Sequence, residues 1–328
     1  MPKRIRNKLL PMVVGLALAY LVTAYFYHPL RATVPFYSKF EMYIDLVRYA
    51  PFSDGGVCPF WERVQGMRRH IAIRRRTKEI MNQSTRLRTD VGGLELWRTP
   101  KGDFWVPQAN DLWSVAVVLA EQENNMYGLP GGLGVHQGDI VLDGGAHIGL
   151  FTRTALASGA KLVVAIEPTP ESVECIRRNE AEGIKSGRVI VIEEGVSDKP
   201  ETVVFERDSK CSVCNHQEEG QEAQKSSFSA KLTTIDELVN RLKLERVDFI
   251  KLDIENAELK AIQGGKRTIA ASGPRLAVAA ENATDRSSYA HQIISEVRGL
   301  RNNYQYHCGA CSVANWHNIS VEILDFYR

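Results

Sequence analysis

The stretch VLDGGAHIGLF, residues 141–151, decides the fold. A short apolar run ends at Asp143, three glycines and a histidine follow, and an apolar segment that looks helical begins at Gly149. Glycine lets the backbone turn tightly and approach a ligand closely, and a helix that begins there exposes free N–H groups at its N-terminus. The stretch therefore predicts a strand, a ligand-binding turn and a helix, in that order.

Strands and helices alternate on both sides of this turn. We expect a hairpin at 94–106 around a turn at 100–102, strands at 140–143, 162–166, 189–192, 203–205, 249–252, 276–280 and 321–326, and helices that begin near 112, 149, 170, 234, 257 and 286. Such alternation predicts an α/β fold with a mostly parallel sheet and helices on both faces. Right-handed crossovers place the carboxyl ends of the strands at one edge, where open α/β sheets bind ligands.

The order of acid and glycines in the turn indicates the ligand. The spacing is Asp143-x-Gly145-x-His147-x-Gly149, whereas a dinucleotide-binding turn reads G-x-G-x-x-G and has no acid that would repel a pyrophosphate. Glu167 ends the next strand, 24 residues after Asp143, and can accept hydrogen bonds from both hydroxyls of a ribose. An acid for an ammonium group, a close backbone and a ribose acceptor together favour S-adenosylmethionine.

Five blocks of sequence extend this interpretation to most of the chain. They read VLDGGAHIGLFT, AIEPTPESVECIRRN, GVSDKPETVVF, KLTTIDEL and VDFIKLDIENAELKAIQGG, within 94–326. In order and spacing they resemble the FkbM-type methyltransferases. The resemblance implies a class I methyltransferase, Rossmann-like sheet of seven strands with an antiparallel last strand. It also implies S-adenosylmethionine as the methyl donor and a hydroxyl group on a sugar or natural product as the acceptor.

The resemblance also implies roles for single residues. The cofactor-binding residues are Asp143, Gly145, His147 and Gly149 around the methionine part, Glu167 at the ribose, and Ser197 and Asp198 beside the adenine. Asp253 and Glu255 match the acid pair of the family after the fourth strand. Asn256 departs from the family, which usually has glycine there, and asparagine tolerates the left-handed backbone that such a turn requires.

The expected chemistry requires an aligned hydroxyl oxygen and a base that takes its proton. The catalytic candidates at the edge of the sheet are Asp253, Glu255 and Glu281, with His147 as a further candidate. Each of them has an alternative role. Asp253 could bind only the ammonium group of the cofactor, Glu255 could cap the next helix, Glu281 could be a plain strand-end carboxylate, and His147 could order the loop.

The N-terminal part of the chain predicts a membrane anchor. Four cations lie within 1–8, and the 19 residues 9–27 carry no charge, which is long enough to cross a bilayer as a helix. The cations place the N-terminus in the cytoplasm, so we expect a single-pass type II protein with a lumenal catalytic domain, in the Golgi or endoplasmic reticulum of a eukaryote. A cleaved signal peptide ending near 17–19 is the alternative. A stem is expected at 28–90 and the catalytic domain at 91–328.

Charge is unevenly distributed over the 328 residues. Residues 1–100 hold 17 Lys and Arg against 7 Asp and Glu, and the remainder holds 24 against 32. Because the basic excess lies outside the expected catalytic domain, the composition argues against a nucleic-acid substrate. Three N-x-S/T sequons begin at Asn82, Asn282 and Asn318, which is compatible with a lumenal domain.

Six cysteines include two Cys-x-x-Cys pairs, Cys211 with Cys214 and Cys308 with Cys311. Such a set binds zinc in many intracellular proteins, whereas outside the cytosol it forms disulfides. The predicted anchor favours disulfides within or between the pairs, and therefore no metal. We expect the remaining candidate, Cys175, to be a small buried side chain.

Together these features predict a membrane-anchored, S-adenosylmethionine-dependent O-methyltransferase that acts on a glycan or glycoconjugate. A glycan-binding module that kept the fold but lost catalysis is an alternative of another class, although it would have no need of the acids Asp143, Glu167 and Asp253. A dinucleotide oxidoreductase is disfavoured by the spacing of the glycine turn.

Overall fold

The computed structural model describes residues 56–107, 112–128, 132–206, 216–217, 227–280, 285–314 and 318–328. The chain divides into two compact units, one made of Met1–Asp54 and Val313–Ile319 and the other of Gly55–Ser312 and Ser320–Arg328. The second unit contains the central sheet. The predicted anchor at 9–27 and the candidate Glu281 lie outside the described residues.

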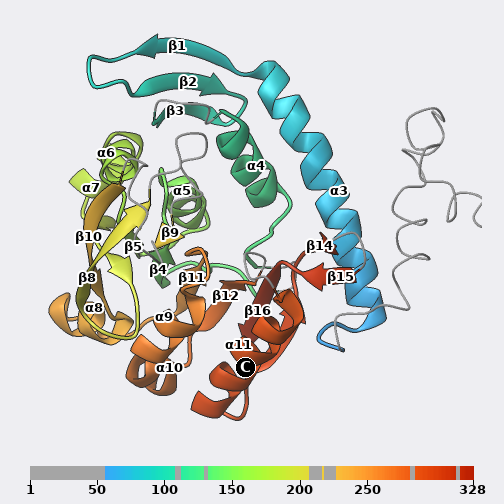
Figure 1. The fold of residues 1–328 in the computed structure, drawn as a ribbon. Helices are drawn as coiled ribbons and strands as arrows, with labels where there is room; N and C mark the ends of the chain where they lie inside the picture. The colour runs from blue at the N-terminus through green and yellow to red at the C-terminus, as the bar shows by residue number, and fades with distance from the viewer. Residues whose placement is uncertain are drawn as a thin grey trace, which may run out of the picture. The chain divides into compact units, whose positions relative to one another are not determined.

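A seven-stranded sheet forms the centre of this unit (Figure 1). Its strands are β4 (Ile140–Gly144), β5 (Leu162–Ile166), β6 (Val189–Ile192), β11 (Phe249–Leu252), β12 (Arg275–Ala279), β13 (Gln305–Cys308) and β16 (Ile323–Tyr327). They lie in the order β13-β16-β12-β11-β4-β5-β6. Only β16 is antiparallel to its neighbours in this sheet. The predicted α/β sheet with an antiparallel last strand is confirmed.

Nine helices accompany the described strands. They are α3 (Phe60–Gln83), α4 (Leu112–Glu123), α5 (Leu150–Ala157), α6 (Pro170–Asn179), α7 (Ala181–Lys185), α8 (Ile235–Arg241), α9 (Glu258–Gly264), α10 (Lys266–Ser272) and α11 (Arg286–Leu300). One predicted helix, at 257–271, is divided between α9 and α10. The two helices meet at Gly264 and Gly265. A Cβ atom on Gly264 would overlap the carbonyl oxygen of Ser197, and one on Gly265 would lie in tight contact with Ile235, so the helix pair can pack closely against these residues only because both positions are glycine.

Two smaller sheets complete the second unit. β1 (Thr85–Thr89), β2 (Glu95–Thr99) and β3 (Gly102–Val106) form an antiparallel sheet that contains the predicted hairpin. β7 (Gly195–Val196), β8 (Glu201–Glu206), β9 (His216–Gln217) and β10 (Ser227–Thr233) form the other, of which the sequence predicted only the centre of β8. The short strands β14 (Cys311–Ala314) and β15 (Asn318–Val321) precede β16.

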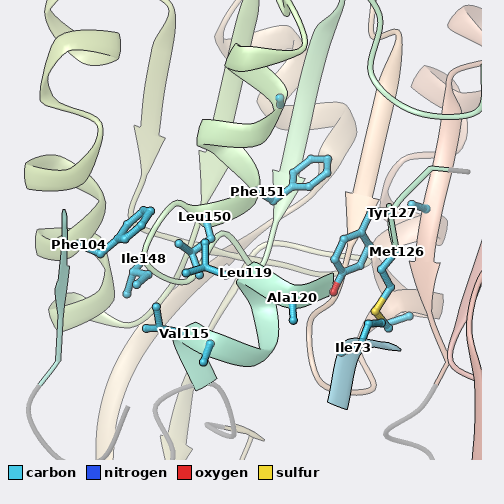
Figure 2. Packing of buried hydrophobic residues seen from close by; sticks show 14 of the residues in the cluster. Ile73, Phe104, Val115, Leu119, Ala120, Met126, Tyr127, Ile148, Leu150 and Phe151 are labelled. Carbon is cyan, nitrogen blue, oxygen red and sulfur yellow. The ribbon is translucent and has the colours of Figure 1, made fainter. Parts of the chain in front are cut away.

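The main core lies between the sheet and the helices α3, α4 and α5. Val141, Val163 and Phe249 occupy the same face of adjacent strands, and they pack with Leu119 of α4 and Phe151 of α5. Figure 2 shows the side chains of α4 and α5 meeting in this core. Burial of so many aliphatic and aromatic groups is the main stabilising term, at about 1.5–3 kcal/mol for each large side chain.

The described part of the predicted stem, residues 56–90, belongs to the same compact unit as the sheet. Helix α3 packs along α4 and contributes Ile73 and Ile80 to the main core. Strand β1 pairs with β2 across the predicted boundary at residue 91. The basic composition of α3 concealed an apolar stripe that includes Val64 and Met67, which are buried.

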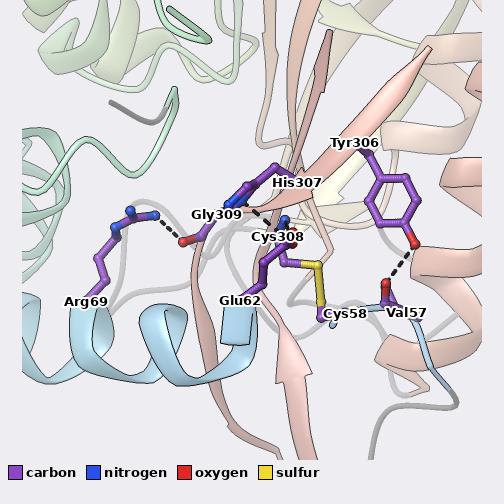
Figure 3. The surroundings of a disulfide bond; sticks show 8 residues. All are labelled: Val57, Cys58, Glu62, Arg69, Tyr306, His307, Cys308 and Gly309. Carbon is purple, nitrogen blue, oxygen red and sulfur yellow. Dashed lines mark hydrogen bonds and ion pairs between the residues drawn. A yellow bond between two sulfur atoms is a disulfide. The ribbon is translucent and has the colours of Figure 1, made fainter. Parts of the chain in front are cut away.

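A disulfide joins the start of α3 to the edge of the sheet. Cys58 is bonded to Cys308 of β13 across 250 residues of sequence (Figure 3). Around it, the Cys308 N–H donates to Glu62 at 2.8 Å and the Tyr306 hydroxyl donates to the Val57 carbonyl at 2.7 Å. Arg69 also donates to the carbonyl of Gly309. Four separate contacts therefore hold this end of α3 to the strand.

This disulfide corrects the predicted pairing of the cysteines. Cys308 is oxidised, as expected, but its partner is Cys58 and not a member of a Cys-x-x-Cys pair. Spacing suggested the pairs, whereas the packing of α3 against β13 brings together two cysteines that are remote in sequence. Cys311, also predicted to be oxidised, is a buried thiol and not part of a disulfide. Cys211 and Cys214 lie outside the described residues, and Cys175 is buried as predicted.

Within the ranges described, no helix has both the length and the apolar character that a bilayer span requires. In the same ranges, no group of three or more His, Cys, Asp and Glu side chains is arranged to hold a metal ion.

Candidate functional site

The turn after β4 has the geometry that its glycines predicted. Gly145 and Gly149 have φ of 74° and 90°, and the N–H groups of Gly145 and Ala146 donate to the carbonyl of Ile166 on β5. A Cβ atom on Gly145 would overlap the carbonyl oxygen of Asp253. The backbone of the turn therefore lies directly against the chain that follows β11, where any larger residue would push the two apart.

Glu167 holds the turn in place from the end of β5. Its carboxylate accepts hydrogen bonds from the N–H of His147 at 2.9 Å and from the N–H of Thr169 at 3.0 Å. Burial raises the pKa of this carboxyl, and the two hydrogen bonds oppose the rise. His147 has φ of 50°, and its N–H bond to Glu167 supports the loop-ordering alternative.

Asp143 lies beneath the turn and is completely buried. The hydroxyl of Thr152 on α5 donates to its Oδ2 at 2.6 Å, and Lys251 Nζ lies 3.5 Å from its Oδ1. Burial is the largest cause of the raised pKa of this carboxyl, and Lys251 opposes it. Because none of the side chain is exposed, the structure supports a role in shaping the loop more directly than contact with a ligand.

Lys251 connects the turn with the chain that follows β11. Its register partner on β4 is Asp143, and its ammonium group donates to the carbonyl of Gly145 at 2.7 Å. The same group lies 3.8 Å from Asp253 Oδ2, which also accepts a hydrogen bond from the Tyr127 hydroxyl at 2.8 Å. Two groups on different elements therefore hold Asp253 at the carboxyl edge of the sheet.

The turn between β11 and α9 carries the second predicted acid. Glu255 and Asn256 have φ of 54° and 72°, so Asn256 adopts the left-handed backbone expected of it. Helix α9 has Ala257 at its N-cap and no side-chain cap hydrogen bond, so the predicted capping role of Glu255 is wrong. Glu258, the first residue of α9, accepts from the N–H of Ile254 in the preceding turn at 2.9 Å. Glu258 also accepts from the Tyr289 hydroxyl at 2.6 Å.

Glu255 is a predicted site residue whose pKa is strongly raised by its surroundings. Its pKa is raised to about 8, first by burial and then by the negative charges of Asp253 and Glu258. In the part of the chain that the structure covers, its carboxylate has no hydrogen-bond or ion-pair partner. A carboxylate in this state is free to act on a ligand.

The predicted adenine turn lies next to α9. Ser197 is buried, its N–H donates to the carbonyl of Thr233 at 2.8 Å, and its hydroxyl donates to Asp198 at 3.0 Å. Asp198 itself is exposed. The structure thus places Asp143, Glu167, Asp253 and Glu255 at one edge of the sheet, and Ser197 with Asp198 beside the β11–α9 chain.

Sequence reasoning missed Lys251, Tyr127 and Glu258. One signal was present for Lys251, since a charged residue within the apolar run DFIKL of a buried strand needs a partner of opposite charge. No comparable signal marked Tyr127 or Glu258, because their partners lie 126 and 31 residues away.

The described residues fit a bound S-adenosylmethionine. Gly145 and His147 of the glycine turn are partly exposed at the carboxyl edge of the sheet. The Glu167 carboxylate lies against this turn, 2.9 Å from the His147 N–H, and a carboxylate at this position accepts hydrogen bonds from ribose hydroxyls in related folds. When bound, the cofactor supplies a methyl group that is already activated by its positively charged sulfur.

The sheet order and these site residues define an α/β methyltransferase that uses S-adenosylmethionine as its methyl donor. The chain belongs to the FkbM methyltransferase domain family, whose model matches residues 143–307.

Similar proteins include the hexuronic acid methyltransferase AglP of Haloferax volcanii, which is 24% identical over 161 residues. That alignment spans 49% of this chain and 63% of the relative, which is less than two thirds of its length. Among solved structures, an FkbM methyltransferase from Methylobacillus flagellatus is 20% identical, with 66% of this chain and 54% of that chain covered and a TM-score of 0.46. A precorrin-6y C5,15-methyltransferase from Geobacter metallireducens is 13% identical, with 60% and 84% covered and a TM-score of 0.34.

Replacing Glu167 by alanine should weaken S-adenosylmethionine binding about 10- to 150-fold, since losing a charged hydrogen-bond partner costs about 1.5–3 kcal/mol. Isothermal titration calorimetry of the full chain measures the effect. Glu174→Ala is the control, because Glu174 lies on the next helix and its ion pair is with the half-buried Arg178 on the same helix. Equal affinity of the Glu167 and Glu174 variants would remove Glu167 from the cofactor site.

Replacing Glu255 by glutamine should stabilise the protein only at neutral and alkaline pH. The folded-state pKa of about 8 lies above the ordinary value of 4.5, so the stability that the neutral carboxyl contributes is present below about pH 4.5 and is lost as the pH rises to about 8. The difference in Tm between the variant and the unaltered protein should therefore grow over this interval. The exposed Glu245 provides the control, and a pH-independent difference for Glu255→Gln would contradict its raised pKa.

Proposed function

We propose that this protein transfers a methyl group from S-adenosylmethionine to a hydroxyl group of a glycan or glycoconjugate. The donor methyl is already activated, so the protein has to align the acceptor oxygen and remove its proton. A sugar hydroxyl is a weak acid, and a base with a raised pKa suits it.

The observation that carries this proposal is the group of carboxylates at the end of β11. Asp253 is fixed by Tyr127 and Lys251, so it is suited to hold and orient a ligand. Glu255 is half-buried beside it, without a hydrogen-bond partner among the described residues, and with a pKa raised to about 8. Carboxylates that can hold and orient a ligand, at an edge where a carboxyl group of raised pKa can accept a proton, are what hydroxyl methylation requires. Glu281, which lies outside the described residues, remains a predicted base.

The glycan acceptor has support from the comparison with AglP. That relative is a hexuronic acid methyltransferase, and it aligns with 49% of this chain at 24% identity. A sugar hydroxyl on an acidic or neutral glycan is therefore the acceptor to test first. The mildly acidic composition of 101–328 agrees with a substrate other than nucleic acid.

We also propose that the protein is a single-pass type II membrane protein with its catalytic domain on the lumenal side, anchored by residues 9–27. The Cys58–Cys308 disulfide supports this topology, because disulfides persist in oxidising compartments. The sequon at Asn82 lies at the exposed end of α3, where a glycan can be accommodated. Protease protection of sealed microsomes tests the topology, and digestion of the catalytic domain without detergent would contradict it.

The proposed activity is tested by incubating the purified chain with methyl-labelled S-adenosylmethionine and a panel of neutral and uronic-acid-containing glycans. We expect label in a methyl ether, which resists alkaline hydrolysis, whereas a methyl ester would be released. Binding of the donor without transfer to any glycan would favour the non-catalytic glycan-binding alternative. Binding of NAD in place of the donor would contradict the methyltransferase assignment itself.

A further inference from the structure

Glu121 lies in the last turn of α4. The residues that follow this helix bind both the backbone of Glu121 and the side chain of Asp253. The N–H groups of Asn124 and Met126 donate to the carbonyl of Glu121 at 3.1 and 3.0 Å. Tyr127, which follows directly, donates to Asp253 at 2.8 Å. Figure 2 shows Ala120, Met126 and Tyr127 together at this end of α4. The same short segment therefore carries Glu121 and Tyr127 to the carboxyl end of β11.

The groups that act on Glu121 show which half of the edge it faces. Its carboxyl interacts electrostatically with Asp253 and Lys251 of the β11 chain and with Glu322, the residue before β16. Strands β12 and β16 lie on the opposite side of β11 from β5, which ends at Glu167. Glu121 thus faces the half of the edge away from the predicted ribose acid. An in-line displacement requires the acceptor oxygen to approach from the side opposite the leaving sulfur.

Glu121 differs from Asp253 and Glu322 in that its carboxylate makes no direct polar contact with another described side chain. Asp253 is held by Tyr127, and Glu322 lies 3.3 Å from His70 Nδ1. Across the described ranges, the Glu121 carboxylate makes no hydrogen bond and no ion pair. Its side chain is half-buried.

We infer that Glu121 receives the proton of the acceptor hydroxyl, an inference that rests on the proposed O-methyl transfer. The acceptor oxygen forms a bond to the methyl carbon while the methyl–sulfur bond breaks and its electron pair stays on sulfur. The O–H electron pair stays on oxygen, and the proton moves to the carboxylate of Glu121. The products are a methyl ether, S-adenosylhomocysteine and a protonated Glu121, which later releases its proton to water.

The surrounding charges suit this role. Burial and the negative charges of Asp253 and Glu322 raise the pKa of Glu121 to about 8, and Lys251 opposes them. From α3, His70 is paired with Glu322, and Arg76 is paired with Glu123 on the outer side of α4. General bases act best when their pKa lies near the working pH. The pKa of Glu255, by contrast, is raised by burial and by the negative charges of Asp253 and Glu258, which lie within three residues of it where the chain passes from β11 into α9.

The experiment compares Glu121→Gln, Glu255→Gln and Glu123→Gln in the full chain, with the acceptor that the unaltered protein methylates. Glu123 is the matched control because it lies on the same helix and forms surface ion pairs with Arg76 and Lys101. We expect kcat of Glu121→Gln to fall about 100- to 10,000-fold, with the acid limb of its pH profile lost. Glu123→Gln should stay within about threefold of the unaltered protein, and S-adenosylmethionine affinity should be unchanged in both. A Glu121→Ala variant should recover activity with added formate.

A second readout does not depend on turnover. In the Glu255→Gln background, infrared spectra of the cofactor-free protein should contain a carboxyl band that titrates near neutral pH, and this band should be missing when Glu121→Gln is added. The inference is overturned if Glu121→Gln keeps its rate and pH profile, or if Glu255→Gln alone loses the acid limb, and in both cases O-methylation stands. If the unaltered protein binds the donor but methylates no hydroxyl, the proposed function fails and the role of Glu121 fails with it.

Discussion

Replacing Cys58 by serine should lower the free energy of unfolding by about 2–5 kcal/mol, which is a large part of the stability of a typical domain. The Cys58–Cys308 bond closes a loop of 250 residues, and a loop of that length restricts the unfolded chain strongly. Both cysteines are buried, so the variant also places a serine hydroxyl in a site built for sulfur. Urea unfolding followed by circular dichroism measures the loss.

Three controls separate the disulfide from the side chains that form it. Cys308→Ser and the double variant should lose about as much stability as Cys58→Ser, because each removes the same bond. Reductant should destabilise the unaltered protein and leave the variants unchanged. If reductant has no effect on the unaltered protein, the bond does not contribute and the contacts of Glu62 and Tyr306 alone hold α3 to β13.

Replacing Gly145 by alanine should abolish S-adenosylmethionine binding and destabilise the fold. The backbone at Gly145 has φ of 74°, and an added Cβ would overlap the carbonyl oxygen of Asp253. The turn could accept the methyl group only by moving away from β11, which would break the bond from Lys251 to the Gly145 carbonyl. Calorimetric titration and thermal unfolding measure the two effects.

Gly187→Ala is the matched control for this substitution. Gly187 has φ of 72°, almost the same as Gly145, but an added Cβ there has no atom within 4 Å. The control therefore isolates the cost of the left-handed backbone, about 1–2 kcal/mol. If both variants lose only this amount and still bind the cofactor, close packing between the turn and the β11 chain is not required.

Local sequence patterns predicted those strands whose residues are mostly apolar and whose ends are marked by turn residues. Strands β5, β6 and β11 begin and end at the expected residues, because each is a short run of apolar residues bounded by a turn. Strands β10 and β13 were not predicted from the sequence. β10 is half exposed and alternates weakly, and β13 carries Tyr306 and His307 at an edge of the sheet, where hydrophobic patterning is weak.

The site was predictable to the extent that its residues lie at strand ends. Asp143, Glu167 and Asp253 each follow an apolar run, so the topology of a parallel sheet brings them to one edge. Tyr127 and Glu121 reach that edge from α4, and His70 reaches Glu322 from α3. Nothing near these three residues in the sequence marks the partner that each one meets.

The sequence by itself determined the α/β class, the order of most strands and helices, the glycine turn and the cofactor, because these depend on local backbone preferences and on the periodicity of apolar residues. Only the tertiary structure decided that α3 joins the catalytic unit, that Cys58 pairs with Cys308, and that Lys251 lies among Asp143, Asp253 and the Gly145 carbonyl. Such contacts join residues up to 250 positions apart, and side-chain packing selects them after the chain has folded back on itself.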